Sequence, residues 1–216
     1  MPALLPLLLA LFVARADSVD ILLKGGTVYD GSGGAARTVD IGIRGDRIVF
    51  VGDAAKARLT AGKIVDAKGM IVSPGFIDPH THVLEGVASA SEDRRRAIGE
   101  VMQGVTTVTI GPDGRGPYDV ARIQAETEQR GLGVNTFAMV GFGAVRSTVM
   151  GNSSAPASPA QIDSMRTLID KAMREGSYGV GSGLFYAPQS YATIEEVIAV
   201  ISAAKPYGGV YDTHQR

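Results

Sequence analysis

The sequence contains no cysteine, and this absence excludes a disulfide scaffold, a cysteine-ligated zinc or iron–sulfur site, and a cysteine nucleophile. Any metal ion must therefore be bound by histidine, aspartate, glutamate or lysine. An excess of one charge is also absent, because 21 basic residues are balanced by 22 acidic ones. Since no dense basic run occurs, we expect a small-molecule partner, and neither nucleic acid nor an anionic membrane surface.

Tryptophan is absent and aromatic residues make up only 6% of the chain, whereas glycine occurs 28 times in 216 residues. Glycine serves tight turns and close backbone contacts, so this composition favours a β-rich or α/β protein over a helix bundle. A hydrophobic content of 45% with 20% charged residues is typical of a soluble globular protein with a real core.

The N-terminal segment has the pattern of an export signal. An apolar stretch from Leu4 to Val13 is followed by Ala14-Arg15-Ala16, which matches a signal-peptide core and a small-x-small cleavage site. About ten apolar residues are too few to span a bilayer, and no other segment resembles a membrane span. We therefore predict that residues 1–16 are a signal peptide, that the mature chain begins at Asp17, and that the protein is periplasmic or secreted. Because the terminal amine is the only positive charge before the stretch, an uncleaved buried helix and a misassigned start codon are the alternatives.

Two patterns follow each other along the rest of the chain. Residues 17–72 contain short strand-like runs separated by turns, and Gly45-Asp46 has the glycine-first pattern of a two-residue hairpin. From residue 73, strand-like runs alternate with amphipathic helical segments, which is typical of βα units and a parallel sheet. The predicted strands are 75–80, 106–110, 134–140, 179–184 and 209–213, with helices near 91–103, 117–130, 158–174 and 193–205. Capping boxes are predicted at Ser158-Pro-Ala-Gln161 and Thr193-Ile-Glu-Glu196.

The histidines mark the most informative segment, Pro74-Gly-Phe-Ile-Asp-Pro-His-Thr-His82. Alternate residues of a strand share a face, so Asp78, His80 and His82 would project to one side, with the histidines about 7 Å apart at Cα. Two imidazoles at that spacing can bind one ion. The third histidine, His214, ends the fifth predicted strand, at the face of a parallel barrel where catalytic groups gather. Structural histidines are the alternative interpretation.

This segment, preceded by Ile21-Leu-Leu-Lys-Gly-Gly-Thr-Val-Tyr-Asp-Gly31, resembles the metal-dependent amidohydrolase superfamily. Three further segments resemble its N-acyl-D-amino-acid deacylase (D-aminoacylase) branch: Gly104-Val-Thr-Thr-Val-Thr-Ile-Gly111, Gly179-Val-Gly-Ser-Gly-Leu-Phe-Tyr-Ala-Pro188 and Tyr211-Asp-Thr-His-Gln-Arg216. The His-x-His motif is common to the superfamily, whereas the Ser-Gly-Leu-x-Tyr-x-Pro motif is more specific.

The resemblance implies an α/β fold, a (β/α)8 TIM barrel beside a small β-sandwich formed from both chain ends. Residues 17–72 would form part of the sandwich and residues 73–216 the first five βα units, so the chain is predicted to be an incomplete barrel. His80, His82 and His214 would bind one or two zinc ions, and Tyr186 would face the substrate. The general acid/base of the family is an aspartate after the last barrel strand, beyond Arg216. We therefore expect no catalytic residue within this chain, and a truncated chain that is inactive alone.

Several positions depart from the pattern of the relatives. Many of them carry a cysteine ligand in Gly-Asn-Cys-Gly, where this sequence has Gly111-Pro-Asp-Gly114. Asp113 is predicted to replace it, since carboxylates also bind zinc; a turn aspartate is the alternative. Phe142 and Leu84 stand where a histidine and an aspartate are common, which leaves the substrate subclass open. Arg146, on a predicted long loop over 141–156, is a candidate for binding a substrate carboxylate, with a surface arginine as the alternative.

These observations predict a zinc-dependent amidohydrolase that deacylates N-acyl-D-amino acids to a carboxylate and a D-amino acid. A cyclic-amide hydrolase of the dihydroorotase or hydantoinase type is one alternative. Those relatives usually bridge two metals with a carboxylated lysine of the fourth strand, and residues 178–184 contain no lysine. A truncated barrel that binds metal or ligand without turnover is the non-enzymatic alternative.

Overall fold

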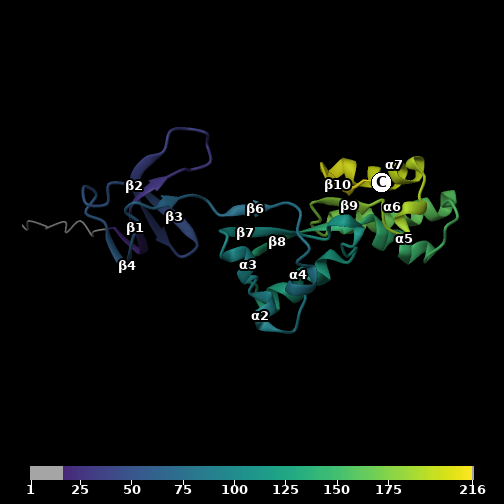
Figure 1. Ribbon diagram of the computed structural model, residues 1–216, viewed down its shortest axis with the longest axis horizontal. Coiled ribbons are helices and arrows are strands. Elements are labelled where there is room, and N and C mark those ends of the chain that lie inside the picture. Colours follow the sequence, from purple (N-terminus) through teal and green to yellow (C-terminus); the bar gives the residue numbers. More distant parts are fainter. Residues whose placement is uncertain (1–16, 216) are drawn as a thin grey trace, which may run out of the picture. The chain divides into compact units, whose positions relative to one another are not determined.

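The computed structural model describes residues 17–215, which fall into two compact units that meet in sequence between Pro74 and Gly75 (Figure 1). The signal peptide predicted for residues 1–16 lies outside the described residues. Within residues 17–215, no helix is both long enough and apolar enough to cross a membrane.

The first unit is a single five-stranded sheet built around its longest strand. This strand, β1 (Ser18–Val28), pairs antiparallel with β2 (Arg37–Arg44) and parallel with β4 (Thr60–Asp66) and β5 (Ile71–Val72). The fifth strand, β3 (Arg47–Gly52), pairs antiparallel with β2 through the predicted hairpin, in which Gly45 has a φ of +58°. The hairpin is therefore confirmed. In the described part of this unit there is one sheet, so the predicted sandwich stays a prediction.

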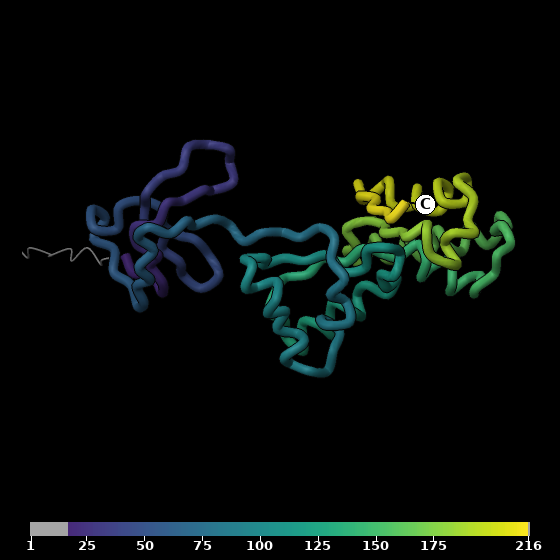
Figure 2. Tube along the Cα trace, viewed as in Figure 1, coloured from purple at the N-terminus to yellow at the C-terminus, as the bar shows by residue number. Residues whose placement is uncertain are grey.

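The second unit contains a parallel sheet whose strands keep their order along the chain. It runs β6 (Phe76–Asp78), β7 (Val105–Ile110), β8 (Asn135–Gly141), β9 (Gly179–Gly183) and β10 (Val210–His214), each strand parallel to the next. The trace through these strands can be followed in Figure 2. All five predicted strands are present, and a parallel sheet whose strands keep their sequence order fits part of a βα barrel.

Side chains across the sheet show that it is curled. In a flat sheet, four intervals of about 4.8 Å would separate β6 from β10 by about 19 Å. Yet His80, two residues after β6, has its Nδ1 atom 2.9 Å from Oδ2 of Asp212 on β10. Two side chains of this length can meet only if the sheet bends toward closure. The second unit is therefore a curled parallel sheet that fits an incomplete TIM barrel.

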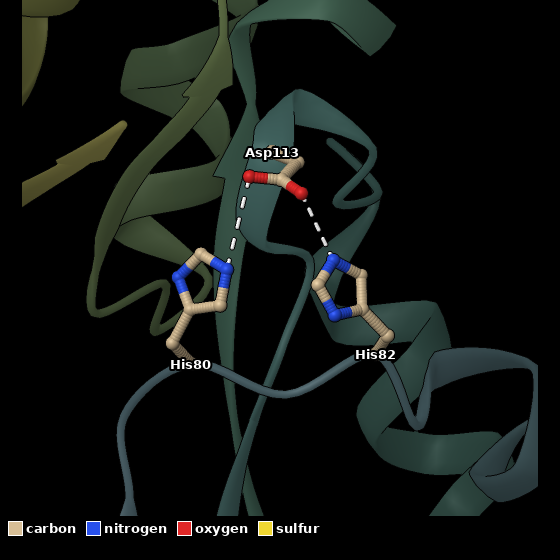
Figure 3. Close-up of side chains that lie close together, drawn as sticks. All are labelled: His80, His82 and Asp113. Carbon is tan, nitrogen blue, oxygen red and sulfur yellow. Dashed lines mark hydrogen bonds and ion pairs between the residues drawn. The ribbon is translucent and has the colours of Figure 1, made fainter. Parts of the chain in front are cut away.

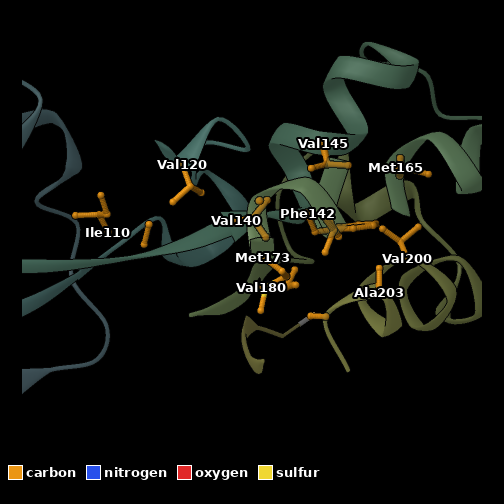
Figure 4. Close-up of a cluster of buried hydrophobic side chains, with 14 of the residues drawn as sticks. Ile110, Val120, Val140, Phe142, Val145, Met165, Met173, Val180, Val200 and Ala203 are labelled. Atoms are coloured by element: carbon orange, nitrogen blue, oxygen red, sulfur yellow. The ribbon is translucent and has the colours of Figure 1, made fainter. Parts of the chain in front are cut away.

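The helices cover one face of this sheet and form the core with it. The longer ones are α4 (Val120–Arg130), α5 (Phe142–Met150), α6 (Pro159–Arg174) and α7 (Ile194–Ile201), followed by a 3₁₀ segment over Ser202–Tyr207. Their apolar faces pack against β8 and β9 in one buried cluster, shown in Figure 4, which includes Ile110, Val120, Val140, Phe142, Val145, Met165, Ile169, Val180 and Val200.

Three predictions of local structure need correction: one helix, one capping box and one loop. The helix predicted near 91–103 is two short helices, α2 (Glu92–Arg95) and α3 (Ile98–Val101), because Ala97 between them has a φ of +47°. A further short helix, α1 (Leu84–Val87), precedes them. The capping box at Ser158 is confirmed, whereas at Thr193 only the hydroxyl caps the helix. The loop predicted over 141–156 begins instead with α5.

Candidate metal centre

His80 and His82 lie in the loop that follows β6, since this strand ends at Asp78 and does not reach His80 as predicted. Two hydrogen bonds hold the loop in place. The His80 backbone N–H donates to Oδ1 of Asp78 over 3.1 Å, and the buried Thr81 hydroxyl donates to the Thr109 carbonyl at the end of β7 over 2.5 Å. Both imidazoles therefore point toward Asp113, as Figure 3 shows.

Asp113 lies in a tight 3₁₀ turn, Pro112–Gly114, directly after β7. Its φ of +56° is left-handed, a conformation that aspartate tolerates better than most residues. Buried Gln189 fixes the turn, because its Nε2 donates to the Asp113 carbonyl over 3.0 Å and its Oε1 accepts the Gly183 N–H over 2.8 Å. A Cβ on Gly114 would lie 2.1 Å from this Oε1 atom, so the turn requires glycine there.

The Asp113 carboxylate faces three imidazoles. Its Oδ2 atom lies 2.9 Å from Nε2 of His82, while Oδ1 lies 3.8 Å from Nε2 of His80 and 3.9 Å from Nδ1 of His214. The side chain is only 7% exposed, and within residues 17–215 Oδ1 is the one buried side-chain polar atom without a hydrogen-bond partner. A buried, unpartnered carboxylate oxygen is unfavourable unless another group binds it.

These donors fit a divalent metal ion. One ligand atom each from His80, His82 and Asp113 can be chosen so that all three lie within 4.8 Å of one another. Two ligands bound tetrahedrally to one zinc ion lie about 3.4 Å apart, so the 3.8 Å and 3.9 Å separations at Oδ1 need only small shifts. The ligand atoms are nitrogen and oxygen with no thiolate sulfur, so the site offers chemically harder, less polarisable ligands than a cysteine-containing site.

Asp212 is a site residue that the sequence interpretation missed. Its Oδ2 atom lies 2.9 Å from Nδ1 of His80, so the ionised carboxylate accepts the Nδ1–H and leaves Nε2 free on the side of Asp113. Carboxylates commonly orient metal-binding histidines in this way. Strand alternation could have revealed it, because Asp212 and His214 share one face of β10.

Tyr186 lies beside the same centre. Its hydroxyl is 3.3 Å from Nδ1 of His214, and the two rings meet edge to face with centroids 5.1 Å apart. Exposed Phe185 stacks on the His214 ring with centroids 5.8 Å apart and also meets the Tyr186 ring edge to face at 5.5 Å. The structure thus brings together the predicted residues His80, His82, Asp113, His214 and Tyr186 at the carboxyl ends of the strands.

Arg146 does not share this environment, which corrects its predicted role in binding a substrate carboxylate. Its side chain on α5 is wholly buried, and Nε lies 2.8 Å from Oε1 of Glu196. Its remaining nitrogens donate to the Ser153 and Ala155 carbonyls over 2.8 and 3.0 Å. Since the guanidinium charge is already neutralised inside the protein, Arg146 holds the segment after α5 in place.

The other two departures from the family pattern are also core residues. Phe142 is fully buried in the main hydrophobic cluster, and Leu84 packs against that cluster at the start of α1. Apolar packing explains both side chains at these positions, and neither carries a metal-binding atom.

Comparison with known proteins extends the likeness to most of the chain. The amidohydrolase family model matches residues 63–204. The chain is 36% identical to a D-aminoacylase of Alcaligenes xylosoxydans xylosoxydans, over 94% of this chain and 46% of the relative.

Two solved structures share its fold. A D-aminoacylase studied for its binuclear metal center is 32% identical, with a TM-score of 0.80 over 90% of this chain and 45% of the other. An N-acyl-D-glutamate deacylase from Bordetella bronchiseptica, complexed with zinc and a phosphonate inhibitor, is 25% identical, with a TM-score of 0.84 over 92% and 45%. The chain spans about half the length of these relatives, and it belongs to the amidohydrolase family.

Proposed function

We propose that the protein is a zinc-dependent hydrolase of N-acyl-D-amino acids. The observation that carries this proposal is the buried Oδ1 atom of Asp113, which has no hydrogen-bond partner and faces nitrogen atoms of His80 and His214. The similar D-aminoacylase and N-acyl-D-glutamate deacylase support the substrate class.

In this proposal His80, His82, His214 and Asp113 hold one or two zinc ions. Zinc at such a site polarises the amide carbonyl and provides a nucleophile near neutral pH. Asp212 keeps the Nε2 atom of His80 available, because its carboxylate accepts the Nδ1–H. The overall reaction breaks the amide C–N bond, adds the water oxygen to the acyl carbon, and leaves the proton on the amine.

Tyr186 is the residue that we assign to the substrate. Its hydroxyl lies at the rim of the centre, 3.3 Å from His214, where it can donate to an oxygen of the scissile amide or of its tetrahedral intermediate. A Tyr186→Phe variant should keep its zinc and lose kcat, since the substitution removes the hydroxyl and retains the ring.

Zinc binding tests the metal assignment directly. Isothermal titration should show that Asp113→Asn weakens zinc binding by more than the 10–100-fold (about 1–3 kcal/mol) typical of an outer-shell partner. Asparagine tolerates the same left-handed φ, so this substitution removes the charge without straining the turn. Asp163→Asn, on the exposed face of α6, is the matched control and should leave zinc affinity unchanged.

Unaltered zinc binding by both Asp113→Asn and the double variant His80→Ala/His82→Ala would reject the site. For the substrate class, release of a free D-amino acid from N-acetyl-D-leucine should require zinc. Ring opening of a hydantoin in place of amide deacylation would favour the cyclic-amide hydrolases. The absence of lysine from β9 (Gly179–Gly183) argues against that alternative.

We also propose that the protein is exported, as the pattern of residues 1–16 indicates. Mass spectrometry of the exported protein should find Asp17 at the N-terminus. An intact Met1 would contradict this proposal.

The first unit is proposed to be one layer of a β-sandwich. Large apolar side chains on its strands are exposed, including Ile64 at 60% and Ile71 at 72%. A second layer packed on this sheet would bury them. Hydrogen exchange of these strands in the whole protein should then be slower than for an open sheet.

A further inference from the structure

We propose that Arg115 binds the carboxylate of the substrate and makes the site selective for acids over neutral amides. This inference rests on the proposed deacylase function and adds a residue to it. Arg115 directly follows the Pro112–Gly114 turn, two residues after Asp113, and its side chain is exposed. Two residues of chain span at most about 7 Å, so the arginine reaches the surroundings of the centre.

Arg115 and Tyr186 line one cavity next to the metal centre. The cavity has a volume of 310 Å³, and its wall also includes Gly143, Ser147 and Pro188. A volume near 300 Å³ is at the small end of ligand pockets and suits a single acylated amino acid. The guanidinium carbon lies 5.9 Å from the centroid of the Tyr186 ring, and the hydroxyl of this ring is 3.3 Å from His214. The cavity is therefore bordered by a cation and by Tyr186, whose hydroxyl lies near the metal centre.

The charge of Arg115 is not neutralised by the protein. Among residues 17–215, no carboxylate lies within ion-pair distance of its guanidinium and no hydrogen bond involves its side chain. By contrast, the guanidinium of Arg146 on α5 already forms an ion pair with Glu196 and donates hydrogen bonds to two backbone carbonyls. A guanidinium over the face of an aromatic ring still has N–H groups to donate, and these suit a planar carboxylate that accepts two parallel hydrogen bonds.

The chemistry of the substrate matches this geometry. In an N-acyl amino acid, the carboxylate is separated from the scissile amide nitrogen by one carbon atom. A ligand whose amide carbonyl lies at the metal centre therefore has its carboxylate a few ångströms away, and we place that carboxylate along the wall formed by Tyr186 and Arg115. A neutral amide of the same size would leave the guanidinium without an anionic partner.

Paired probes of equal size test the proposal: N-acetyl-D-leucine and its neutral carboxamide, N-acetyl-D-leucinamide. Binding to the zinc-loaded protein is followed by NMR titration, including the Arg115 Nε–H resonance, so the result does not depend on turnover. In the wild-type protein the acid should shift this resonance and the carboxamide should not. Arg115→Met should weaken binding of the acid by about 10–100-fold and that of the carboxamide by less than about threefold.

Arg115→Lys should restore part of the preference for the acid, since it returns the charge without the planar fork. Arg94→Met, an exposed arginine on α2, is the matched control and should leave both affinities unchanged. An unaltered preference in Arg115→Met, or an equal loss for both probes, would overturn the assignment. If the wild-type protein binds the acid through Arg115 but never releases D-leucine, the deacylase proposal fails and the anion site stands.

Discussion

The ion pair of Arg146 and Glu196 should be a large single contribution to the stability of the second unit. The two side chains are 0% and 3% exposed, and their Nε and Oε1 atoms are 2.8 Å apart. Arg146→Met removes the cation and leaves the Glu196 carboxylate buried with only the Ala157 N–H as donor, at 3.1 Å. Breaking a buried pair in this way costs about 3–5 kcal/mol.

The same reasoning predicts that Arg146→Met and Glu196→Leu do not have additive effects on the free energy of unfolding. In Arg146→Met/Glu196→Leu both charges are gone, so no uncompensated ion remains in the core. Apolar replacements of buried pairs are often neutral or stabilising, and most of the loss should therefore be recovered. The Ser153 and Ala155 carbonyls lose their donors in either variant, which leaves a residual cost of about 1–3 kcal/mol.

Urea unfolding followed by far-ultraviolet circular dichroism measures these free energies, provided that the slope with denaturant is unchanged. Arg122→Met is the matched control, because Arg122 pairs with Glu126 on the surface of α4 with side chains 55% and 35% exposed. Arg122→Met should leave the free energy of unfolding close to that of the wild-type protein, because solvent screens an exposed pair. A loss below about 1 kcal/mol in Arg146→Met, combined with weaker binding of N-acetyl-D-leucine, would refute the structural role and restore Arg146 as a substrate ligand.

Three further perturbations have defined outcomes. Asp212→Asn should weaken zinc binding about 10–100-fold and change the tautomer of His80, read from its ring ¹⁵N shifts, because the Nδ1–H loses a charged acceptor. Thr193→Ala should lower the unfolding free energy by about 1 kcal/mol, since its hydroxyl caps α7, whereas Thr193→Ser should not. The hydrogen bond from Lys171 lowers the pKa of the Glu175 carboxyl, so Lys171→Met should raise this pKa in a ¹³C NMR titration. The stability that Glu175 contributes is present at neutral pH and is lost as the pH falls through its lowered pKa.

Local patterns were sufficient to predict the sheet. The strands of the second unit are apolar runs bounded by turns, and each of the five predicted strands overlaps an observed one. His80, His82 and His214 were also predictable as a group, because the carboxyl ends of parallel strands meet at one face. The contacts that hold these histidines in place were not predictable, since β6 ends before His80 and the loop is held by the hydrogen bond from Thr81 to the Thr109 carbonyl on β7.

The errors arose where distant residues decide the local structure. Glycines at 141, 143 and 151 predicted a loop, yet this segment begins with α5. The helix forms because Phe142 and Val145, spaced three apart, are buried in the core. Arg146 on the same helix also forms an ion pair with Glu196, fifty residues later in the chain. No local pattern contains that pairing. The same ion pair explains why Thr193 lacks a full capping box: the Glu196 carboxylate that would complete it binds Arg146 and Ala157 instead.

Asp113 shows why a residue type can be predicted and its environment cannot. The sequence predicted a carboxylate ligand from its place after the second barrel strand, but a turn aspartate would occupy the same place. Three non-local contacts separate the two interpretations: Gln189 holds the backbone, Gly183 leaves room for it, and His82 lies within 2.9 Å of one oxygen. A turn aspartate uses its oxygens on nearby backbone N–H groups. Here Oδ1 has no such bond and faces His80 and His214, so the arrangement fits the proposed ligand better than a turn aspartate.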